Sequence, residues 1–389
     1  MSAIARSKSD ERGDYLRGHA MKLLVIFSGY NQRAVVSFLR VVALYDIPFV
    51  IVSSGPPDPI HYSSYKDRVC YDRMDQSLSI AVFEPVLDSL RDSYPGYTYI
   101  FVPSSEALNR FLIDNVEYLS TKSVFIPLVC KNTYCSISDK HVFRSICRDA
   151  SIKIPEDFAN LCKLPAVAKP KIGHASQYRT LYPRLIFNDD QKTDFLKSVL
   201  KDDFFFERYI EGESYYLLYY FSKSGKVTSY SQKNLVQQPG GKSIIAAESA
   251  SIHREEVGDK FVTLFKRLNF WGPVMVEVRF DGSDYYFIDA NPRLWGPSQL
   301  FVDAGIKLFE HYLMDMGFDL GADMDSNSDG KESTYFWLGG LVNSMRDERG
   351  PTYHKGISEE AFKKNIGSFI RNEIYMREDT FQIYLKELL

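Results

Sequence analysis

Short apolar runs alternate with amphipathic segments along the first third of the chain. Four runs are almost wholly apolar, as strands buried on both faces are: residues 22–27, 48–52, 98–102 and 124–126. Three segments between them repeat apolar side chains at helical spacing: residues 31–45, 77–90 and 105–118. Strands that alternate with helices predict a parallel, doubly wound sheet, which binds ligands at the carboxyl ends of its strands. The pattern therefore predicts an α/β domain over residues 21–127.

The pattern changes after residue 128. A helix is predicted over residues 138–150, followed by a short strand at 166–169 and a helix near 189–201. Most later segments alternate or carry aromatic runs, which favours strands: residues 204–209, 214–221, 226–235, 273–280 and 285–290. The last two flank an Asp-Gly turn and predict a hairpin, and residues 255–268 predict a helix.

The polarity pattern also divides the second part of the chain. We predict two α+β subdomains, residues 128–203 and 204–318, and a polar linker over 319–333. Residues 334–389 carry helical segments at 358–374 and 380–388 and are predicted to form a C-terminal helical extension. The expected fold class is thus α/β followed by α+β.

Composition and charge narrow the function classes. A net charge of −3 argues against a nucleic-acid-binding protein, and no run approaches the ~18 apolar residues of a membrane span. The five cysteines are odd in number and include no C-x-x-C pair, so we expect reduced thiols in a cytoplasmic protein. Residues 1–20 are polar and lack the apolar core of a secretory signal, and we predict a disordered tail.

The predicted hairpin concentrates polar residues that suit a metal and a phosphate. Side chains two apart on a strand share a face, so Asp289, Asn291 and Arg293 point the same way, and Glu277 reaches that face from the paired strand. Mg²⁺ takes oxygen ligands from one or two carboxylates plus substrate phosphates, and Arg binds a phosphate through two parallel hydrogen bonds. A solvated face with incidental salt bridges is the alternative, but the Asn-Pro-Arg sequence favours a site.

These residues resemble the metal-binding end of the ATP-grasp superfamily, in particular the carboxylate–amine ligases and the ATP sites of biotin carboxylase and the carbamoyl-phosphate synthase large subunit. The resemblance spans roughly residues 21–315. It implies that Glu277, Asp289 and Asn291 hold magnesium and that Arg293 contacts the terminal phosphate or the acyl phosphate. The family usually has Glu where this chain has Asp289, whose side chain reaches less far.

The same resemblance implies an ATP site. Lys140, which opens a helix, and Lys169, which ends a strand, are expected at the phosphates. The hinge residues Glu207, Arg208 and Ile210 are expected at the adenine, with Glu213 at the ribose. The loop at residues 171–176 takes the place of the family's phosphate-covering loop, although it has a single glycine; His174 and Ser176 are its candidate contacts.

Candidate substrate residues come from several segments. The resemblance suggests Lys233 as a catalytic residue near the acyl phosphate, and the strand pattern places Arg279 beside Glu277, where it orients the carboxylates or binds a substrate carboxylate. The weaker candidates for substrate binding follow a strand, a turn or the Asn-Pro-Arg sequence: Arg33, Glu106, Gly241, Lys242, Trp295 and Ser298.

The resulting hypothesis is a ligase that uses ATP and one or two Mg²⁺ ions, for which Mn²⁺ can substitute. It activates a small-molecule carboxylate as an acyl phosphate and couples it to an amine, releasing ADP and phosphate. We expect no nucleic-acid or membrane partner, and a homodimer is compatible with the sequence. Two alternatives stay open, a carboxylase-type ATP-grasp enzyme that activates bicarbonate and a non-catalytic ATP-binding protein.

Overall fold

The parallel sheet predicted for the N-terminal part is present. The computed structural model describes residues 21–170, 183–198, 201–321 and 330–389 of the 389-residue chain. The sheet order is β3-β2-β1-β4-β5, and all its pairings are parallel. Its strands are β1 (Lys22–Phe27), β2 (Phe49–Ser53), β3 (Val69–Asp72), β4 (Thr98–Phe101) and β5 (Val124–Phe125).

Alternation along β1 explains why helices cover both faces of this sheet. Leu24 and Ile26 belong to one core cluster, whereas Leu23, Val25 and Phe27 belong to another. The first face packs on α1 (Gln32–Leu44) and the second on α2 (Ile80–Ser93) and α3 (Glu106–Asp114), with α4 (Val116–Ser120) following. The single helix predicted over 105–118 is divided at Asn115, which caps α3.

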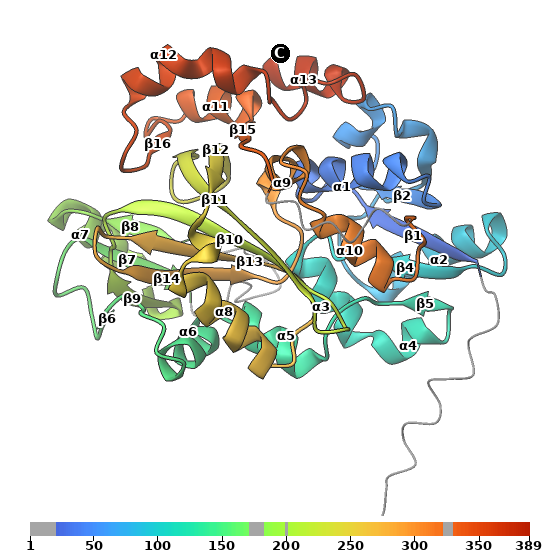
Figure 1. Cartoon of the computed structure of the whole chain (residues 1–389), viewed down its shortest axis with the longest axis horizontal. Helices are drawn as coiled ribbons and strands as arrows, with labels where there is room; N and C mark the ends of the chain where they lie inside the picture. The colour runs from blue at the N-terminus through green and yellow to red at the C-terminus, as the bar shows by residue number, and fades with distance from the viewer. Residues whose placement is uncertain (1–20, 171–182, 199–200, 322–329) are drawn as a thin grey trace, which may run out of the picture.

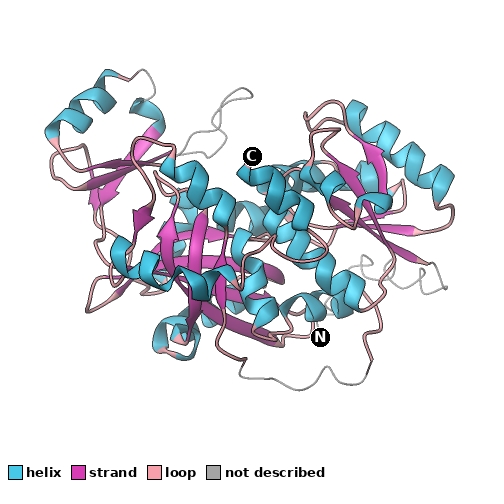
Figure 2. Cartoon of the chain, turned by 90° about the horizontal axis from the view of Figure 1, so that it is seen from above, coloured by secondary structure: helices cyan, strands magenta, loops and turns pink. Residues whose placement is uncertain are grey.

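A small antiparallel sheet, called the lid below, lies at the opposite end of the molecule from the parallel sheet (Figures 1 and 2). Its order is β6-β9-β7-β8. Between residues 131 and 208 the elements are, in chain order, α5 (Lys131–Ser138), α6 (Lys140–Asp149), β6 (Asp157–Phe158), β7 (Ala166–Pro170), β8 (Arg184–Ile186), α7 (Asp189–Lys197) and β9 (Phe204–Arg208). Of these, α5 and α6 pack in the core cluster of the central sheet.

The central sheet carries the predicted hairpin at one edge. Its order is β14-β13-β10-β11-β12-β15, with β16 paired to β11. The strands are β10 (Glu213–Phe221), β11 (Val227–Gln237), β12 (Ile244–Ala250), β13 (Gly272–Phe280), β14 (Tyr285–Asn291), β15 (Thr334–Phe336) and β16 (Thr352–Tyr353). The sequence pattern did not indicate β3, β6, β8, β12, β15 or β16, because each is short or lacks clear alternation.

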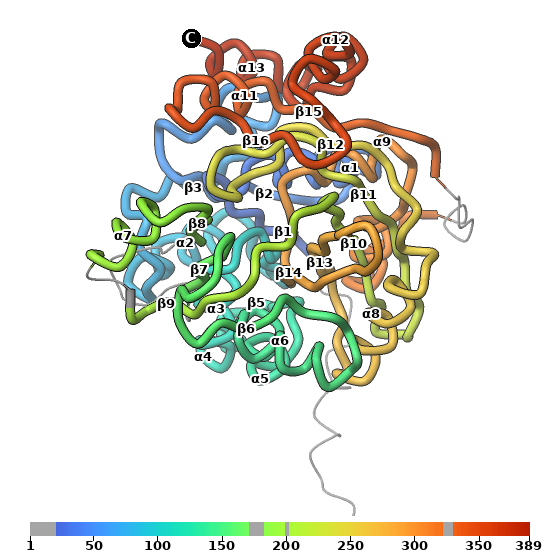
Figure 3. The backbone as a smooth tube through the Cα atoms, turned by 90° about the vertical axis from the view of Figure 1, so that its left-hand side faces the viewer, coloured from blue at the N-terminus to red at the C-terminus, as the bar shows by residue number. Residues whose placement is uncertain are grey.

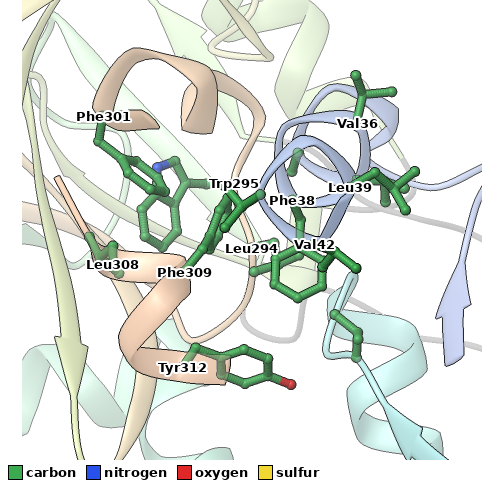
Figure 4. Close-up of a cluster of buried hydrophobic side chains, with 14 of the residues drawn as sticks. Val36, Phe38, Leu39, Val42, Leu294, Trp295, Phe301, Leu308, Phe309 and Tyr312 are labelled. Carbon is green, nitrogen blue, oxygen red and sulfur yellow. The ribbon is translucent and has the colours of Figure 1, made fainter. Parts of the chain in front are cut away.

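Each face of the central sheet packs against different helices. Leu217, Val276 and Val278 pack toward α8 (Glu256–Arg267), whereas Leu218 and Met275 join the cluster that includes α9 (Gln299–Asp303) and α10 (Leu308–Asp315). The second cluster also contains α1, so it fastens the N-terminal domain to the central sheet. Figure 4 shows this packing: Phe309 and Tyr312 meet Phe38 of α1, and the Trp295 ring lies beside Phe301.

The C-terminal helices cover the far end of the central sheet (Figures 1 and 3). They are α11 (Leu338–Met345), α12 (Glu359–Ile370) and α13 (Phe381–Leu388). Phe362 and Phe369 of α12 pack with Val236 and Ile245 of the sheet. Short 3₁₀ turns complete the description: η1 (Pro59–Tyr62), η2 (Lys66–Arg68), η3 (Lys201–Asp203), η4 (Ile252–Arg254) and η5 (Gly296–Ser298). Among the described helices, none is both long and apolar enough to cross a membrane.

Candidate active site

Glu277 and Asp289 stand opposite each other on β13 and β14. The strand register pairs their Cα atoms, and both side chains are half-buried. Directly paired residues share a sheet face, so the carboxylates point to the same side. Burial raises the pKa of Glu277, and the nearby Asp289 raises it further, against the opposing charge of Arg279. Two adjacent carboxylates in a partly dry site create a strong preference for a cation.

Lys140 already supplies one positive charge to this pair. Its ammonium lies 2.5 Å from Asp289 Oδ1. Asp139 caps α6 by accepting hydrogen bonds from the backbone amides of His141 and Val142. This cap fixes the start of the helix and therefore the position of its first residue, Lys140. Burial alone would raise the pKa of Asp289, but the charge and hydrogen bond of Lys140 outweigh it and the pKa falls. Asp289 therefore stays ionised.

Asn291 and Arg293 extend the site beyond the end of β14. Asn291 donates to Asp289 Oδ2 at 3.3 Å and accepts from Arg293 Nη2 at 3.0 Å. The segment that carries Arg293 is held by the N-terminal domain, because Asn31 donates to the Leu294 carbonyl at 2.8 Å. A donation from the Leu294 amide to the Pro103 carbonyl at 3.3 Å adds a second link. The arginine is thus positioned by loops that follow β1 and β4.

Lys169 and Glu207 form a buried ion pair in the lid, 4% and 1% exposed. Lys169 Nζ lies 2.6 Å from Glu207 Oε1 and donates to the Ile288 carbonyl at 2.8 Å, next to Asp289. The second oxygen of Glu207 accepts from Arg144, which also bonds Asp157. Burial lowers the pKa of Lys169, and the neighbouring Lys140 lowers it further. Both carboxylate oxygens of Glu207 are therefore engaged by cations.

The hinge after β9 presents backbone groups rather than side chains. Arg279 donates to the Tyr209 hydroxyl at 3.0 Å and to the Ile210 carbonyl at 3.2 Å. The amide of Arg208 donates to the Glu156 carbonyl at 2.9 Å. Within the described residues, the Ile210 amide donates to no atom.

A chain of buried polar side chains, which the sequence reading did not single out, leads to Glu277. Gln232 donates to Asn234 Oδ1 at 2.7 Å, Asn234 donates to Ser214 Oγ at 2.9 Å, and Ser214 contacts Glu277 Oε1 at 3.5 Å. All three are 0% exposed, and Gln232 Oε1 has no partner. The sequence did contain a signal for this chain, because it places polar residues in the interior of β10 and β11. Buried polar groups need a hydrogen-bond partner or have a function.

Lys233 and Glu213 lie away from the carboxylate face. Lys233 pairs with Tyr215, which pairs with Val278, so the register puts it on the face opposite Glu277. Its ammonium lies 2.6 Å from Glu213 Oε1, and Glu213 also accepts from Tyr215. The two residues predicted at the acyl phosphate and the ribose instead bond each other.

The weaker substrate candidates are dispersed. Arg33 stacks 3.8 Å above the Trp337 ring centroid and donates to the Ile244 carbonyl and the Tyr335 hydroxyl, and Glu106 pairs with Arg110 at the start of α3. Trp295 and Ser298 are core residues, 1% and 0% exposed. Gly241 and Lys242 lie in the β11–β12 turn. The predicted ATP contacts His174 and Ser176 lie outside the described residues.

The assembled donor set fits a magnesium-type ion. Among the described residues, no three or more His, Cys, Asp or Glu side chains gather as a metal-binding group. An ion here would rely on the two carboxylates of Glu277 and Asp289 and the oxygen of Asn291. Mg²⁺ accepts so few protein ligands when phosphates and water complete its shell. The five cysteines are free thiols in the structure.

Solved structures with the same architecture come from carboxylases and a ribonucleotide synthetase. The biotin carboxylase domain of Hydrogenobacter thermophilus 2-oxoglutarate carboxylase, solved with MgADP and bicarbonate, matches with a TM-score of 0.59 at 14% identity, over 78% of this chain and 72% of that one. N5-carboxyaminoimidazole ribonucleotide synthetase from Thermus thermophilus matches with a TM-score of 0.57 at 13% identity, over 80% and 82%. The chain has the ATP-grasp fold.

A third ATP-grasp structure, biotin carboxylase from Campylobacter jejuni in complex with β-γ-ATP, matches with a TM-score of 0.57 at 14% identity, over 77% of this chain and 72% of that one. No protein-family model and no curated protein matches the sequence. The fold class expected from the sequence, a parallel α/β domain followed by an ATP-grasp domain, is confirmed.

Proposed function

We propose that this protein is an Mg-ATP-dependent ligase that activates a carboxylate as an acyl phosphate and couples it to an amine. The observation that carries the proposal is the Glu277–Asp289 pair, which faces Lys140 and adjoins Lys169 at the junction of lid and central sheet. Paired carboxylates next to two lysines suit a magnesium-bound polyphosphate. The ATP-grasp fold supports this placement of the nucleotide.

The nucleotide would lie between the lid and the central sheet. The Ile210 amide is the donor for the adenine edge, and Lys140 and Lys169 are the cations for the phosphates. Glu207 takes a different role from the one first expected. Its oxygens are committed to Lys169 and Arg144, so it positions Lys169 and leaves adenine recognition to the backbone.

Glu277, Asp289 and Asn291 would hold the magnesium. When bound, Mg²⁺ neutralises phosphate charge and orients the terminal phosphate for in-line attack. Lys140 is poised to leave Asp289 for a phosphate oxygen, since its flexible side chain carries a mobile positive charge. Positioning and charge neutralisation by these side chains supply most of the rate acceleration.

The chemistry proceeds in two steps. An oxygen of the substrate carboxylate bonds to the γ-phosphorus while the bond to the β–γ bridging oxygen breaks, which releases ADP and leaves an acyl phosphate. Arg293, held by Asn291 and the Leu294 carbonyl, stabilises the charge on the transferred group. The amine nitrogen then attacks the acyl carbon, phosphate departs, and the nitrogen loses a proton to give the amide.

A screen for ADP formation tests the proposal. The protein is incubated with Mg-ATP and each of a panel of amino acids, peptides and sugar acids, with and without an amine. We expect ADP and phosphate to accumulate in equal amounts only when both a carboxylate and an amine are present. ADP formation that is independent of any carboxylate, or an absence of turnover across the panel despite tight ATP binding, would contradict ligase activity.

Bicarbonate is a second candidate for the activated acid. The structural neighbours include a biotin carboxylase domain solved with bicarbonate and MgADP, which favours including it. Bicarbonate-dependent ADP formation without an amine would support a carboxylase-type reaction. That neighbour is a dimer, and we propose that this chain also forms a homodimer.

A further inference from the structure

A buried arginine without a counter-ion lies at the carboxyl ends of the parallel strands of the N-terminal domain. Arg73 directly follows β3 and is 1% exposed. Among the described residues, its Nε and Nη1 have no hydrogen-bond partner, and its Nη2 meets only the side-chain oxygen of Gln76, at 3.5 Å. A guanidinium carries a permanent positive charge, and a buried charge is costly unless an anion pairs with it. Arg73 is therefore prepared for an anion that the described part of the chain does not supply.

The acidic side chains of the neighbouring loops are committed to other partners. Asp58 accepts from two hydroxyls and two backbone amides. Asp72 accepts from a hydroxyl and contacts a histidine ring, and Asp75 accepts from a backbone amide two residues further on. None of these hydrogen bonds involves the guanidinium of Arg73. The positive charge is therefore not one half of a structural ion pair.

Two aromatic rings and one amide surround the guanidinium. Its central carbon lies 5.4 Å from the ring centroid of Phe27 and 5.6 Å from that of Tyr30. The Tyr30 hydroxyl donates to the Gln76 carbonyl at 3.0 Å and lies 3.4 Å from its side-chain oxygen. Gln76 is exposed, so a ligand can displace its side chain without opening the core. The amide oxygen of Gln76 thus occupies the place that an anionic oxygen would take.

A second donor without a partner lies on the same edge of the sheet. Gln32 begins α1, directly after the loop that follows β1. Its side-chain oxygen accepts from the Ser28 hydroxyl at 3.0 Å and from the Gly29 amide at 3.2 Å, whereas its Nε2 is buried without a partner among the described residues. Buried donors are normally paired, and doubly wound sheets bind their ligands at this edge. The unpaired donors therefore indicate a ligand.

The loop after β1 connects this edge to the proposed reaction centre. Asn31 donates to the Leu294 carbonyl at 2.8 Å, and Arg293 Nη1 donates to the same carbonyl at 2.9 Å. Asn31 directly follows Tyr30, whose ring lies beside Arg73. Because β2 lies between β1 and β3, the ends of β1 and β3 are about 10 Å apart. An elongated substrate can therefore place one group at Arg293 and another at Arg73.

We propose that Arg73 binds a second anionic group, a carboxylate or a phosphate, of the acid that is activated at Arg293. The inference rests on the proposed function. The anionic group displaces the side-chain oxygen of Gln76 and accepts parallel hydrogen bonds from the guanidinium, for which its planar fork is suited. The substrate is then an elongated acid with two anionic groups. Bicarbonate and short acids with one anionic group lack this contact.

Calorimetric titration of the full-length chain with inorganic phosphate, glutarate and butyrate, at constant ionic strength, tests the inference. The wild type is compared with Arg73→Gln and with the matched control Arg91→Gln, an exposed arginine on α2 that pairs with Asp88. We expect the wild type and the control to bind phosphate or glutarate at least about tenfold more tightly than Arg73→Gln does, because hydrogen bonds to a charged group are lost. The stronger of these two probes identifies the anionic group as phosphate or carboxylate.

Gln76→Ala gives an independent result on the exposed turn, where the fold is not at risk. Because the competing amide is absent, we expect this variant to bind the same probe more tightly than the wild type. Weaker binding would contradict displacement of Gln76. Circular dichroism checks that Arg73→Gln is folded.

Titration of the wild type with Mg-ADP separates this inference from the proposed function. If the wild type binds Mg-ADP but binds neither phosphate nor glutarate, or binds them as well as Arg73→Gln does, Arg73 is not an anion site, although the nucleotide site stands. Binding of butyrate as tight as that of glutarate would contradict the requirement for two anionic groups. If the wild type binds no Mg-ADP, the proposed function fails, and the assignment of the anion to an activated acid fails with it.

Discussion

Replacement of Arg293 by alanine is expected to reduce ADP formation at least about 100-fold while the protein remains folded, because a donor aimed at developing charge contributes on that scale. The side chain is half-buried just after β14, and its hydrogen bonds within the described part of the chain go to Asn291 and the Leu294 carbonyl. Its removal leaves no apolar cavity in the core. The rate is measured with the substrates found in the screen, and folding by circular dichroism.

Two further variants serve as controls for this result. Arg293→Lys keeps the charge but loses the planar pair of donors, so we expect an intermediate rate. Arg346→Ala, at an exposed position after α11, removes an arginine outside the site and is expected to retain the wild-type rate. Unchanged turnover in Arg293→Ala would remove this residue from the mechanism.

Glu207→Gln is expected to lower the free energy of unfolding by about 3–5 kcal/mol, because it leaves the buried cations Lys169 and Arg144 without their shared anion. The three side chains are 1–4% exposed, so water cannot replace the lost charge. Urea denaturation of both proteins measures the difference.

Glu156→Gln is the matched control for this variant. Glu156 forms an ion pair with Lys163 at 3.1 Å, and both side chains are more than half exposed. Exposed pairs contribute at most about 1 kcal/mol, so the control should differ little from the wild type. A Glu207→Gln protein as stable as the control would show that the buried cluster is not held by its charges.

The hairpin that carries Glu277 and Asp289 could be predicted from the sequence because its turn signal is local. An Asp-Gly turn predicts the pairing of the two strands. The register shifts between Glu277 and Val278, and this β-bulge, which the sequence does not reveal, brings Glu277 opposite Asp289. The position of Lys140 at the start of a helix could also be predicted from a local signal, because Asp139 is a typical N-cap residue.

Other features depend on tertiary contacts that leave no local trace. Glu207 and Arg144 are 63 residues apart in sequence, and nothing near either one indicates that they bond. Lys233 shows how sensitive a strand assignment is, because a shift of one residue moves a side chain to the opposite face. The position of β16 depends on its pairing with β11, and two-residue strands have no recognisable pattern.

Calorimetric titration of the protein with ADP, in the presence and absence of Mg²⁺, tests the central claim most directly. If Glu277, Asp289, Lys140 and Lys169 form an Mg-nucleotide site, ADP binds at least about tenfold more tightly with Mg²⁺. The dependence on Mg²⁺ disappears in the double variant Glu277→Gln/Asp289→Asn. A wild-type protein that binds no ADP, or binds it equally well with and without the metal, would contradict the account.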